Sequence, residues 1–409
     1  MTIDQNILIT GGRAPVALEL ARLLKAAGHR VFVAESAEYH LCRVSSAVEA
    51  SFLVPSPRHQ PQAYIQRLAG LTEELNISCL IPTCEEIFYI AAGLEHITGC
   101  RVLAPCRVLA PCREILAQLH HKGEFIAWVR SLGFAVPETT LISSAAEWHR
   151  TQEIAAADGK QQVYKPAFSR FASKVILPDS GDAAGCRSQK QRQISPPTGI
   201  SAAAPWVAQQ YIKGKAVCTY SIVHEGSVVA HAAYDSRYRT GRSGASVYFE
   251  HLEHPAAQEW VQRFAGAISF SGQIGFDFIE AEDGILYPIE CNPRATSGIH
   301  LFTPEDGLTE ALLNPGMLVQ TGEVLIPRSD RRAMLTLPML GCGLKPGRGG
   351  WSNWRRALRG AEDVICRKGD QRPFREQFRV VYAAQKTAWR HRISITEALT
   401  EDIEWNGEG

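Results

Sequence analysis

The sequence has 409 residues, of which 45% are hydrophobic and 21% charged, as in an ordinary soluble globular protein. Lys plus Arg number 43 and Asp plus Glu 42, so no overall charge favours a nucleic acid or a membrane as partner. The first residues, MTIDQNILITGG, lack a signal-peptide pattern, and no run of about 18 apolar residues predicts a membrane span. The 11 cysteines form no CxxC pair, so we expect free thiols and a cytoplasmic protein.

The first 115 residues alternate between strand and helix patterns. Short apolar runs at 6–10, 31–33 and 79–81 predict strands, a helical pattern covers 17–27, and another helix starts near Glu85. Alternating strands and helices are typical of a parallel, doubly wound sheet. We therefore predict an α/β domain over residues 1–115.

The rest of the chain predicts a mostly antiparallel α+β section. A helical stretch is expected over about 114–132, followed by extended segments at 139–142, 162–165, 206–212, 219–224, 228–234, 275–280 and 286–291. Residues 178–205, rich in small and polar side chains, predict a surface excursion or a mobile connection. From residue 321 the chain becomes Arg-rich, and we predict a separate extension there without a role.

The strongest site signal is a pair of strands, GFDFIE at 275–280 and LYPIECNPR at 286–294, joined through an Asp-Gly turn signal. Asp277 and Glu290 interrupt these apolar strands, and a buried carboxylate is costly unless it is neutralised. Glu290, Asn292 and Arg294 begin on one strand face. Magnesium prefers such oxygen ligands, and Arg294 suits a phosphoryl group. The alternative is an inward salt bridge between Glu290 and Arg294.

Two upstream segments add to this signal. Lys165 stands at the end of an apolar strand, where a lysine grips phosphate or is simply solvated. The segment WVAQQYIKG at 206–214 offers an apolar slot, main-chain groups and the amides of Gln209 and Gln210, which adenine requires. Taken alone, it is also compatible with an ordinary amphipathic strand.

In this order the pieces resemble the ATP-grasp superfamily, whose pattern is K-P, then Q-x-Y-I-x-G, an acidic residue and E-x-N-P-R. Here these are Lys165-Pro166, Gln209–Gly214, Asp277 and Glu290–Arg294, and Lys122 matches the context of the family's first phosphate lysine. The resemblance covers residues 1–320. It implies an α/β domain before the grasp (1–115), an ATP-grasp module of two α+β lobes (116–320, smaller lid lobe about 130–212) and a C-terminal extension (321–409).

The resemblance also implies a set of roles. Lys122 and Lys165 would bind ATP phosphates, and Arg294 would stabilise the transferred phosphoryl group. Two magnesium (or manganese) ions would be shared by Asp277 and Glu290, one of them also held by Asn292. The adenine contacts would come from four consecutive hinge residues, Gln209, Gln210, Tyr211 and Ile212.

Two positions depart from the family pattern. Lys215 falls where the family often has an acidic ribose contact, which leaves the ribose partner open. The loop after Lys165, PAFSRFASKV, has no glycine, whereas the family's phosphate loop is usually Gly-rich. Ser169, Arg170 and Ser173 could donate hydrogen bonds there instead.

The implied function is a ligase of the carbamoyl-phosphate synthase- and biotin carboxylase-like type. It would activate a carboxylate as an acyl phosphate and join it to an amine, with a C–S bond as the alternative, releasing ADP and phosphate. A small-molecule kinase is the second hypothesis, and a non-catalytic nucleotide-binding scaffold that uses the Arg-rich extension is a third. Small-molecule acid and amine substrates are expected, with a homodimer as one possible state.

Substrate recognition is the weaker part of the prediction. The loop DSRYRTGRSG at 235–244 brings together Arg237, Arg239 and Arg242, whose guanidinium groups match a carboxylate, although a solvated basic loop is equally compatible. We expect Arg237 and Arg242 to act in catalysis. Residues Ser297, Gly298 and His300, directly after the metal motif, are candidates for the acceptor pocket.

Three further patterns are set aside. The TGG turn with Glu35 resembles a dinucleotide fingerprint but lacks its later glycines. Tyr211 and Lys215 spell YxxxK, as in short-chain dehydrogenases, yet that pair needs a helix and this segment contains glycine. Cys84, in PTCEE, would need a base to act as a nucleophile, and the sequence assigns none.

Overall fold

The computed structural model describes residues 4–98, 106–169, 174–178, 194–240, 244–344 and 350–407. Arg170, Ser173 and Arg242, which the sequence suggested as site residues, lie outside these ranges, as does most of the excursion at 178–205. Among the helices in the described ranges, none has the length and apolar character needed to cross a membrane.

The N-terminal part is the predicted parallel α/β unit. Its five strands are all parallel and have the order β3-β2-β1-β4-β5. Alternate side chains of β1 pack to opposite faces, Ile7 and Ile9 toward α1 and Leu8 toward α2 and α3. The elements are β1 (Asn6–Thr10), α1 (Pro15–Ala26), β2 (Arg30–Glu35), η1 (Leu41–Val44), β3 (Ala50–Leu53), α2 (Pro61–Glu74), β4 (Cys79–Ile81), α3 (Glu86–Ala92), α4 (Leu94–Thr98) and β5 (Arg107–Val108).

In the turn after β1, a glycine and Glu35 make contacts with other parts of the protein itself. Gly11 has φ +77°, and a Cβ there would lie 2.5 Å from Thr83 Oγ1. Glu35 accepts hydrogen bonds from the main-chain N–H and from Nε of Arg13, at 2.9 and 3.1 Å. The features that resemble a dinucleotide fingerprint therefore have a structural role, in agreement with setting that interpretation aside.

The helical stretch expected over 114–132 is present, but it is divided into two helices, α5 (Arg113–His120) and α6 (Lys122–Ser131). His121 between them is extended, with φ −72° and ψ 106°, and its Nδ1 accepts a hydrogen bond from Glu124 N–H at 3.0 Å. The N–H of Lys122 bonds the carbonyl of Ala167 instead of continuing a helix. The break places Lys122 at the start of α6, beside the loop that follows Lys165.

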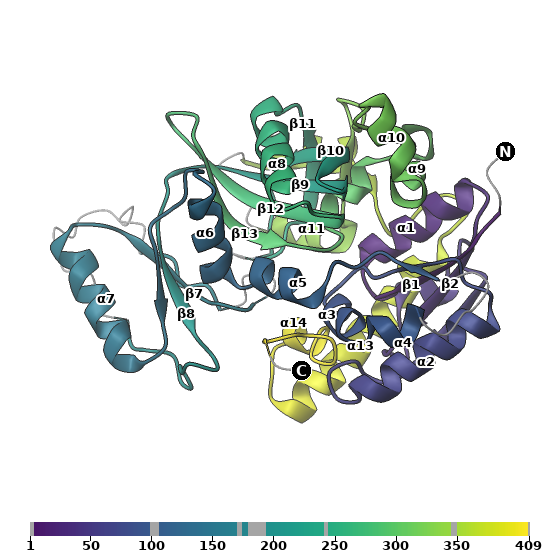
Figure 1. Ribbon diagram of the computed structural model, residues 1–409, viewed down its shortest axis with the longest axis horizontal. Coiled ribbons are helices and arrows are strands. Elements are labelled where there is room, and N and C mark those ends of the chain that lie inside the picture. Colours follow the sequence, from purple (N-terminus) through teal and green to yellow (C-terminus); the bar gives the residue numbers. More distant parts are fainter. Residues whose placement is uncertain are drawn as a thin grey trace.

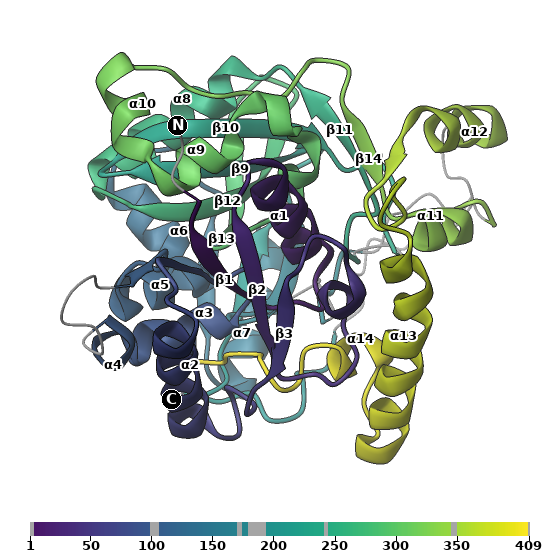
Figure 2. The same cartoon turned by 90° about the vertical axis from the view of Figure 1, so that its right-hand side faces the viewer.

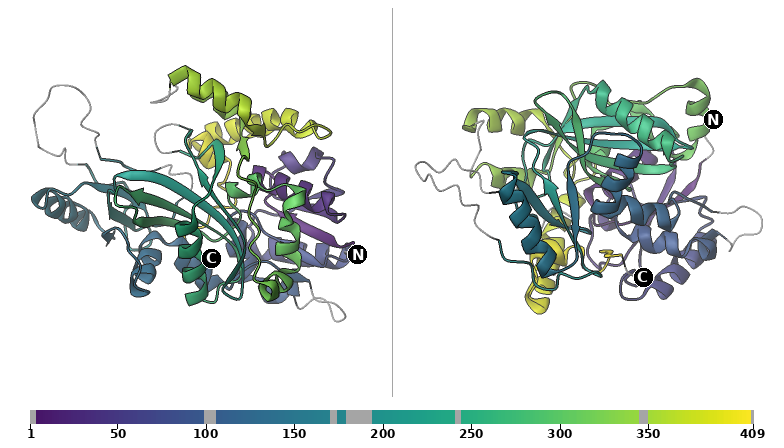
Figure 3. Two further views of the ribbon diagram at one scale, coloured as in Figure 1. Left: turned by 90° about the horizontal axis from the view of Figure 1, so that it is seen from above. Right: turned by 60° about the vertical axis from the view of Figure 1, so that its left-hand side comes forward.

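A small lid lobe projects from the rest of the molecule (Figures 1 and 3). Its antiparallel sheet has the order β6-β8-β7, and α7 covers one face through Trp148, which packs on Tyr164 and Trp206. The strand expected over 206–212 ends at 210, since the chain then crosses to the larger sheet. The lid elements are β6 (Thr139–Ile142), α7 (Ala145–Ala157), β7 (Gln162–Pro166) and β8 (Trp206–Gln210).

The larger lobe is built on a seven-stranded sheet with the order β13-β12-β9-β10-β11-β14-β15. One face packs on α6 and α8 around Phe264 and Phe276, and the other shares a continuous core with α1 of the N-terminal unit. The elements are β9 (Gly214–His224), β10 (Ser227–Asp235), β11 (Tyr248–Leu252), α8 (Pro255–Ala267), β12 (Gly272–Ala281), β13 (Leu286–Asn292), η2 (Ser297–Leu301), η3 (Pro304–Asp306), α9 (Leu308–Leu313) and α10 (Pro315–Thr321).

Residues 321–409, whose sequence predicts a separate extension, are integrated into the molecule. β14 and β15 extend the large sheet, while α11, α12 and α13 lie together along one side (Figure 2). The last described segment, 394–407, returns to the N-terminal unit, and we call it the C-terminal strap. The elements are β14 (Arg332–Met334), α11 (Thr336–Cys342), α12 (Gly350–Gly360), β15 (Glu362–Asp363), α13 (Arg372–His391) and α14 (Ile395–Ala398).

The strap is held by a buried ion cluster that predicts an acid-sensitive fold. Burial opposes ionisation of Glu35, but Arg13 outweighs it, and together with His40 holds the pKa of Glu35 at about 2, below its ordinary 4.5. Because the pKa of Glu35 is lower in the folded than in the unfolded protein, its ionisation stabilises the fold fully above pH 4.5. This stabilisation is lost as the pH falls toward 2. Asp402, the other acid on Arg13, lies 2.6 Å from it.

We expect Glu35→Gln to lose about 3 kcal/mol of stability at pH 7. The difference from wild type should shrink as the pH falls from 5 to about 3, measured as the urea midpoint followed by tryptophan fluorescence. A constant difference across this range would show that Glu35 is not the titrating group.

Candidate active site

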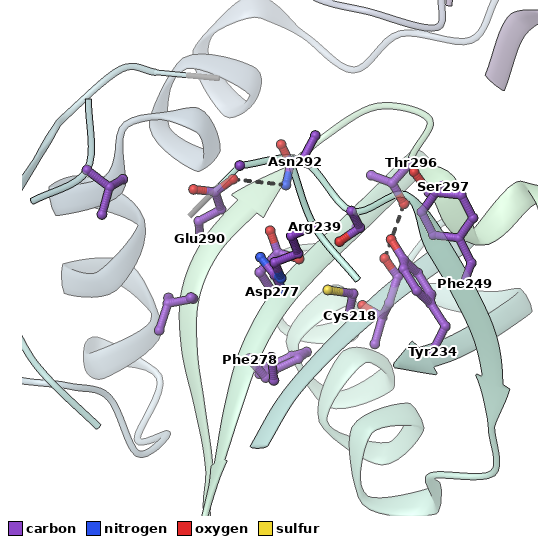
Figure 4. Close-up of a pocket in the computed structure, with 18 of the residues that line it drawn as sticks. Cys218, Tyr234, Arg239, Phe249, Asp277, Phe278, Glu290, Asn292, Thr296 and Ser297 are labelled. Carbon is purple, nitrogen blue, oxygen red and sulfur yellow. Dashed lines mark hydrogen bonds between the residues drawn. The ribbon is translucent and has the colours of Figure 1, made fainter. Parts of the chain in front are cut away.

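The two acids of the sequence motif face each other across a β-hairpin. Asp277 on β12 pairs directly with Glu290 on β13, next to a β-bulge at Asp277/Phe278. Asn292 Nδ2 donates to Glu290 Oε1 at 3.4 Å, and Arg294 donates to Asn292 Oδ1 at 3.0 Å. Figure 4 shows Glu290, Asn292 and Asp277 grouped on one side of the cavity. The predicted pairing of neighbouring antiparallel strands is confirmed.

Two buried lysines approach this acid pair, Lys122 from the start of α6 and Lys165 from β7 of the lid. Lys122 Nζ lies 3.7 Å from Glu290 Oε2 and donates to the carbonyl of Ser169 at 3.1 Å. Lys165 Nζ donates to the carbonyl of Ile289, the residue before Glu290, at 2.7 Å. Only 3% and 4% of these lysines is exposed. Both amino groups are thus held beside Glu290, although 43 residues separate the two lysines in sequence.

The charges at this centre shift one another's proton affinities. Burial lowers the pKa of Lys165 to about 8, against the opposing effect of Glu290. Burial, together with the nearby charge of Glu290, raises the pKa of Asp277. Burial acts to raise the pKa of Glu290 as well, but Lys122 and Lys165 outweigh it and bring that pKa below its ordinary value. A further cation beside Asp277 would stabilise the ionised form of this carboxylate.

The hinge between the lobes carries the four predicted adenine residues. Gln209 Nε2 donates to Thr139 Oγ1 at 3.1 Å, and Gln210 Oε1 accepts from the N–H of Glu138 at 3.2 Å. Both side-chain amides therefore bind the lid itself. The N–H of Tyr211 bonds the carbonyl of Gln161, whereas within the described ranges no residue bonds the N–H of Ile212. The main chain at Ile212 is the best placed hinge group for a ligand.

A cavity of about 560 Å³ joins these groups. This volume lies within the range of small-molecule sites, roughly 300–1,000 Å³. Apolar side chains line the part next to the hinge, among them Val163, Leu177, Ala216, Phe278, Ile279 and Ile289. Asp277, Glu290, Asn292 and Arg294 line the middle. The arrangement offers an apolar slot at the hinge and a polar centre beyond it.

The two described arginines of the substrate loop have different places. Arg237 does not line the cavity; its side chain is 53% exposed and pairs with Asp235 and Glu250 at 3.2 and 3.5 Å. Arg239 does line it, next to Asp277 in Figure 4, and donates to Ser236 Oγ at 2.5 Å. Of this pair, Arg239 is the one placed to meet a substrate.

Of the three acceptor-pocket candidates that follow Arg294, two line the cavity and one does not. Ser297 and His300 line the cavity, but His300 Nδ1 lies 3.1 Å from Glu19 Oε2 on α1, inside the core. Gly298 packs closely on Tyr220, since a Cβ would lie 2.5 Å from that side chain. Cys84 also lines the cavity and is buried. Its neighbour Glu86 accepts hydrogen bonds from Thr10 and from the N–H groups of Thr83 and Cys84, which is a structural role.

Several cavity residues were not predicted from the sequence. Arg13, Tyr234 and Phe249 come from a loop and strands without a motif, and Leu399 and Thr400 come from the C-terminal strap. No local pattern marks these positions, because each reaches the cavity only through the packing of distant elements.

The fold and site define a class: a mixed α/β protein with a cavity of small-molecule size between a lid lobe and a large, mostly antiparallel sheet. Residues 120–298 match the family model described as the ATP-grasp domain. The resemblance inferred from the sequence is therefore confirmed, and this part of the chain is an ATP-grasp domain.

Solved structures share this fold at low sequence identity. N5-carboxyaminoimidazole synthetase from Staphylococcus aureus has a TM-score of 0.57 at 14% identity, covering 86% of this chain and 87% of that one. The biotin carboxylase domain of Hydrogenobacter thermophilus 2-oxoglutarate carboxylase is a dimer in complex with MgADP, ADP and bicarbonate. It has a TM-score of 0.53 at 16% identity, covering 73% of this chain and 65% of that one. L-amino acid ligase from Bacillus licheniformis has a TM-score of 0.50 at 14% identity, covering 73% of this chain and 69% of that one. No curated protein matches the sequence.

Proposed function

We propose that the protein is an ATP- and magnesium-dependent ligase that activates a carboxylate as an acyl phosphate and joins it to an amine. The observation that carries this proposal is a centre of two buried lysines, Lys122 and Lys165, and two half-buried acids, Asp277 and Glu290, which opens into a cavity with an apolar slot at the hinge. The three solved structures named above are those of a synthetase, a biotin carboxylase domain and a ligase.

The donor set suits magnesium. Magnesium is usually held by one or two carboxylates together with phosphate oxygens rather than by an all-protein cage. The described ranges contain no cluster of three or more His, Cys, Asp and Glu that could hold a metal. Asp277, Glu290 and the oxygen of Asn292 would hold the ions, which neutralise phosphate charge when bound. The raised pKa of Asp277 fits a site that a cation completes.

The protein's own groups would position the reactants. Lys165 and Lys122 would bind the phosphates, and the hinge main chain at Ile212 would bind adenine in the apolar slot. Arg294 would stabilise the transferred phosphoryl group, and Arg239 takes the place of Arg237 in our proposal for binding the acid. Little covalent work is left for the protein, so positioning and charge neutralisation dominate.

The proposed reaction has two steps. A carboxylate oxygen of the acid attacks the γ-phosphorus of ATP, and the bond from that phosphorus to the β,γ-bridging oxygen breaks to release ADP. The amine nitrogen then attacks the acyl carbon, the C–O bond to phosphate breaks, and the nitrogen loses a proton to give an amide. Shielding of the acyl phosphate from water is consistent with its place between two lobes.

The expected result of a substrate screen follows from these steps. ADP and phosphate should form only when a suitable acid and amine are both present, measured by coupled ADP release and mass spectrometry of the product. Release of AMP would contradict the acyl phosphate. Phosphate retained on the acceptor after quenching would favour a kinase, and nucleotide binding without any turnover would favour the scaffold.

A further inference from the structure

The C-terminal strap lies at the carboxyl end of the parallel sheet, where open α/β sheets usually bind ligands. Figure 2 shows the yellow tail passing along this end of the sheet. Arg13, in the turn after β1, donates to both carboxylate oxygens of Asp402 at 2.6 and 2.7 Å and to the carbonyl of Leu399 at 3.0 Å. Ser36 Oγ donates to Asp402 at 2.6 Å. The chain itself therefore takes up the polar groups at this crevice.

Aromatic packing anchors the far end of the strap. The Trp405 ring stacks on Phe88 with centroids 4.5 Å apart and an interplanar angle of 8°. Its main-chain N–H donates to Glu85 at 3.2 Å, and Tyr89 donates to the carbonyl of Glu404 at 3.0 Å. Trp405 is 3% exposed, so this end is part of the protein core.

The strap also reaches the loop that follows Lys165. Trp405 meets Phe168 edge-on at 5.3 Å, and Glu397 lies 3.6 Å from Lys174. Both contacts are with residues that follow β7, the lid strand that carries Lys165. The strap thus connects the N-terminal unit to the lid side of the cavity.

Between these anchors the strap forms one wall of the cavity. Leu399, Thr400 and Ile403 line it, and Leu399 is half-buried. Apolar lining also comes from the start of α1, with Ala14, Pro15 and Val16, and from Leu335 directly after β14. These residues come from the N-terminal unit, the segment after β14 and the strap, whereas the hinge slot is lined from the lid and from β9, β12 and β13.

The polar groups near this wall already have partners. The guanidinium of Arg13 is shared by Glu35 and Asp402, and His300 Nδ1 faces Glu19. The Tyr234 hydroxyl interacts with Thr296. A charged side chain placed here would lose water without gaining a free counter-charge, which is costly, whereas apolar surface would gain.

Resting on the proposed function, we propose that the C-terminal strap is the acceptor wall of the site and selects an acid whose side chain is apolar. The carboxylate would face Arg239 and Arg294, and the side chain would lie against Leu399 and its apolar neighbours. Leu399 is thereby a specificity-determining residue, and the Arg13–Asp402 pair holds it in position.

Direct binding tests this proposal without the complete reaction. Calorimetry on the full chain with MgADP present compares 4-methylpentanoate and phenylacetate with succinate, for wild type, Leu399→Asp and Leu399→Ala. Ile395→Asp is the matched control, because Ile395 lies on the same strap, is 39% exposed and does not line the cavity.

We expect wild type to bind the two apolar acids at least about 10-fold more tightly than succinate. Leu399→Asp should weaken the apolar acids by about 10-fold or more, Leu399→Ala by about 3-fold or more, and Ile395→Asp by less than about 2-fold. The affinity for MgADP should stay within about 2-fold in all variants, which also reports that they are folded.

Three results would overturn the proposal: unchanged affinity in the Leu399 variants, succinate bound as tightly as the apolar acids, or no binding of either apolar acid. Failure of the ligase proposal is a separate result, in which no acid and amine together release ADP even though the binding preference for apolar acids is present.

Discussion

Glu290→Gln is expected to reduce ADP release by about 1,000-fold or more, measured with the best acid and amine of the wild type. The change keeps the shape of the side chain but removes its negative charge, which lies 3.7 Å from Lys122 Nζ. Glu290 is also the residue that pairs with Asp277 across the hairpin. It also removes one of the two carboxylates proposed to hold magnesium. The loss should appear in kcat more than in the affinity for the acid.

Glu282→Gln is the matched control for this variant. Glu282 lies on the same hairpin, but its side chain is 76% exposed and pairs with Lys213 on the surface at 3.1 Å. Such exposed pairs contribute roughly 0–1 kcal/mol, so turnover should be unchanged. Circular dichroism should show both variants folded. Turnover of Glu290→Gln within about 3-fold of wild type would remove the metal assignment.

Lys165→Met should lower kcat/KM for ATP by about 100-fold, since the loss of one partner in a buried, hydrogen-bonded charge cluster costs roughly 2–5 kcal/mol. Lys165 is 4% exposed and its Nζ reaches the carbonyl of Ile289 at 2.7 Å, beside Glu290. Methionine fills a similar volume, so the fold should persist. The measurements are initial rates against ATP concentration and the affinity for MgADP.

The comparison variant is Lys160→Met in the same lobe. The Lys160 side chain is 42% exposed and pairs with Glu138 at 2.7 Å. We expect its kcat/KM for ATP to be that of wild type. If Lys165→Met behaved in the same way, Lys165 would be a structural lysine and the phosphate role would pass to Lys122 alone.

Local patterns predicted much of this protein. The strand pattern of residues 6–10 corresponds to β1, and the spacing of Asp277 and Glu290 correctly indicated neighbours on antiparallel strands. Both predictions rest on short-range physics, the period-2 alternation of strands and the turn preference of Asp-Gly. The E-x-N-P-R motif, with Lys165 and the hinge, indicated the ATP-grasp domain that the family model confirms.

Local patterns failed where a tertiary contact overrides them. Residues 114–132 have helical periodicity throughout, yet His121 ends one helix and caps the next because Lys122 N–H bonds Ala167. Arg237 and Arg239 are equivalent in sequence, but salt bridges with Asp235 and Glu250 hold Arg237 on the surface. The contacts that separate these two arginines come from β10 and β11 in the folded sheet.

By itself, then, the sequence determined the alternation of elements, the hairpin that pairs Asp277 with Glu290 and the order of the motifs that indicate an ATP-grasp domain, because each depends on residues close together in the chain. Only the tertiary structure decided which arginine meets the cavity and what closes its far end. Arg13 and Asp402 are 389 residues apart, and Leu399 reaches the cavity only because that pair and Trp405 fix the strap. Contacts between residues so far apart in the chain depend on how whole units pack together, and the spacing of residues along the chain does not predict that packing.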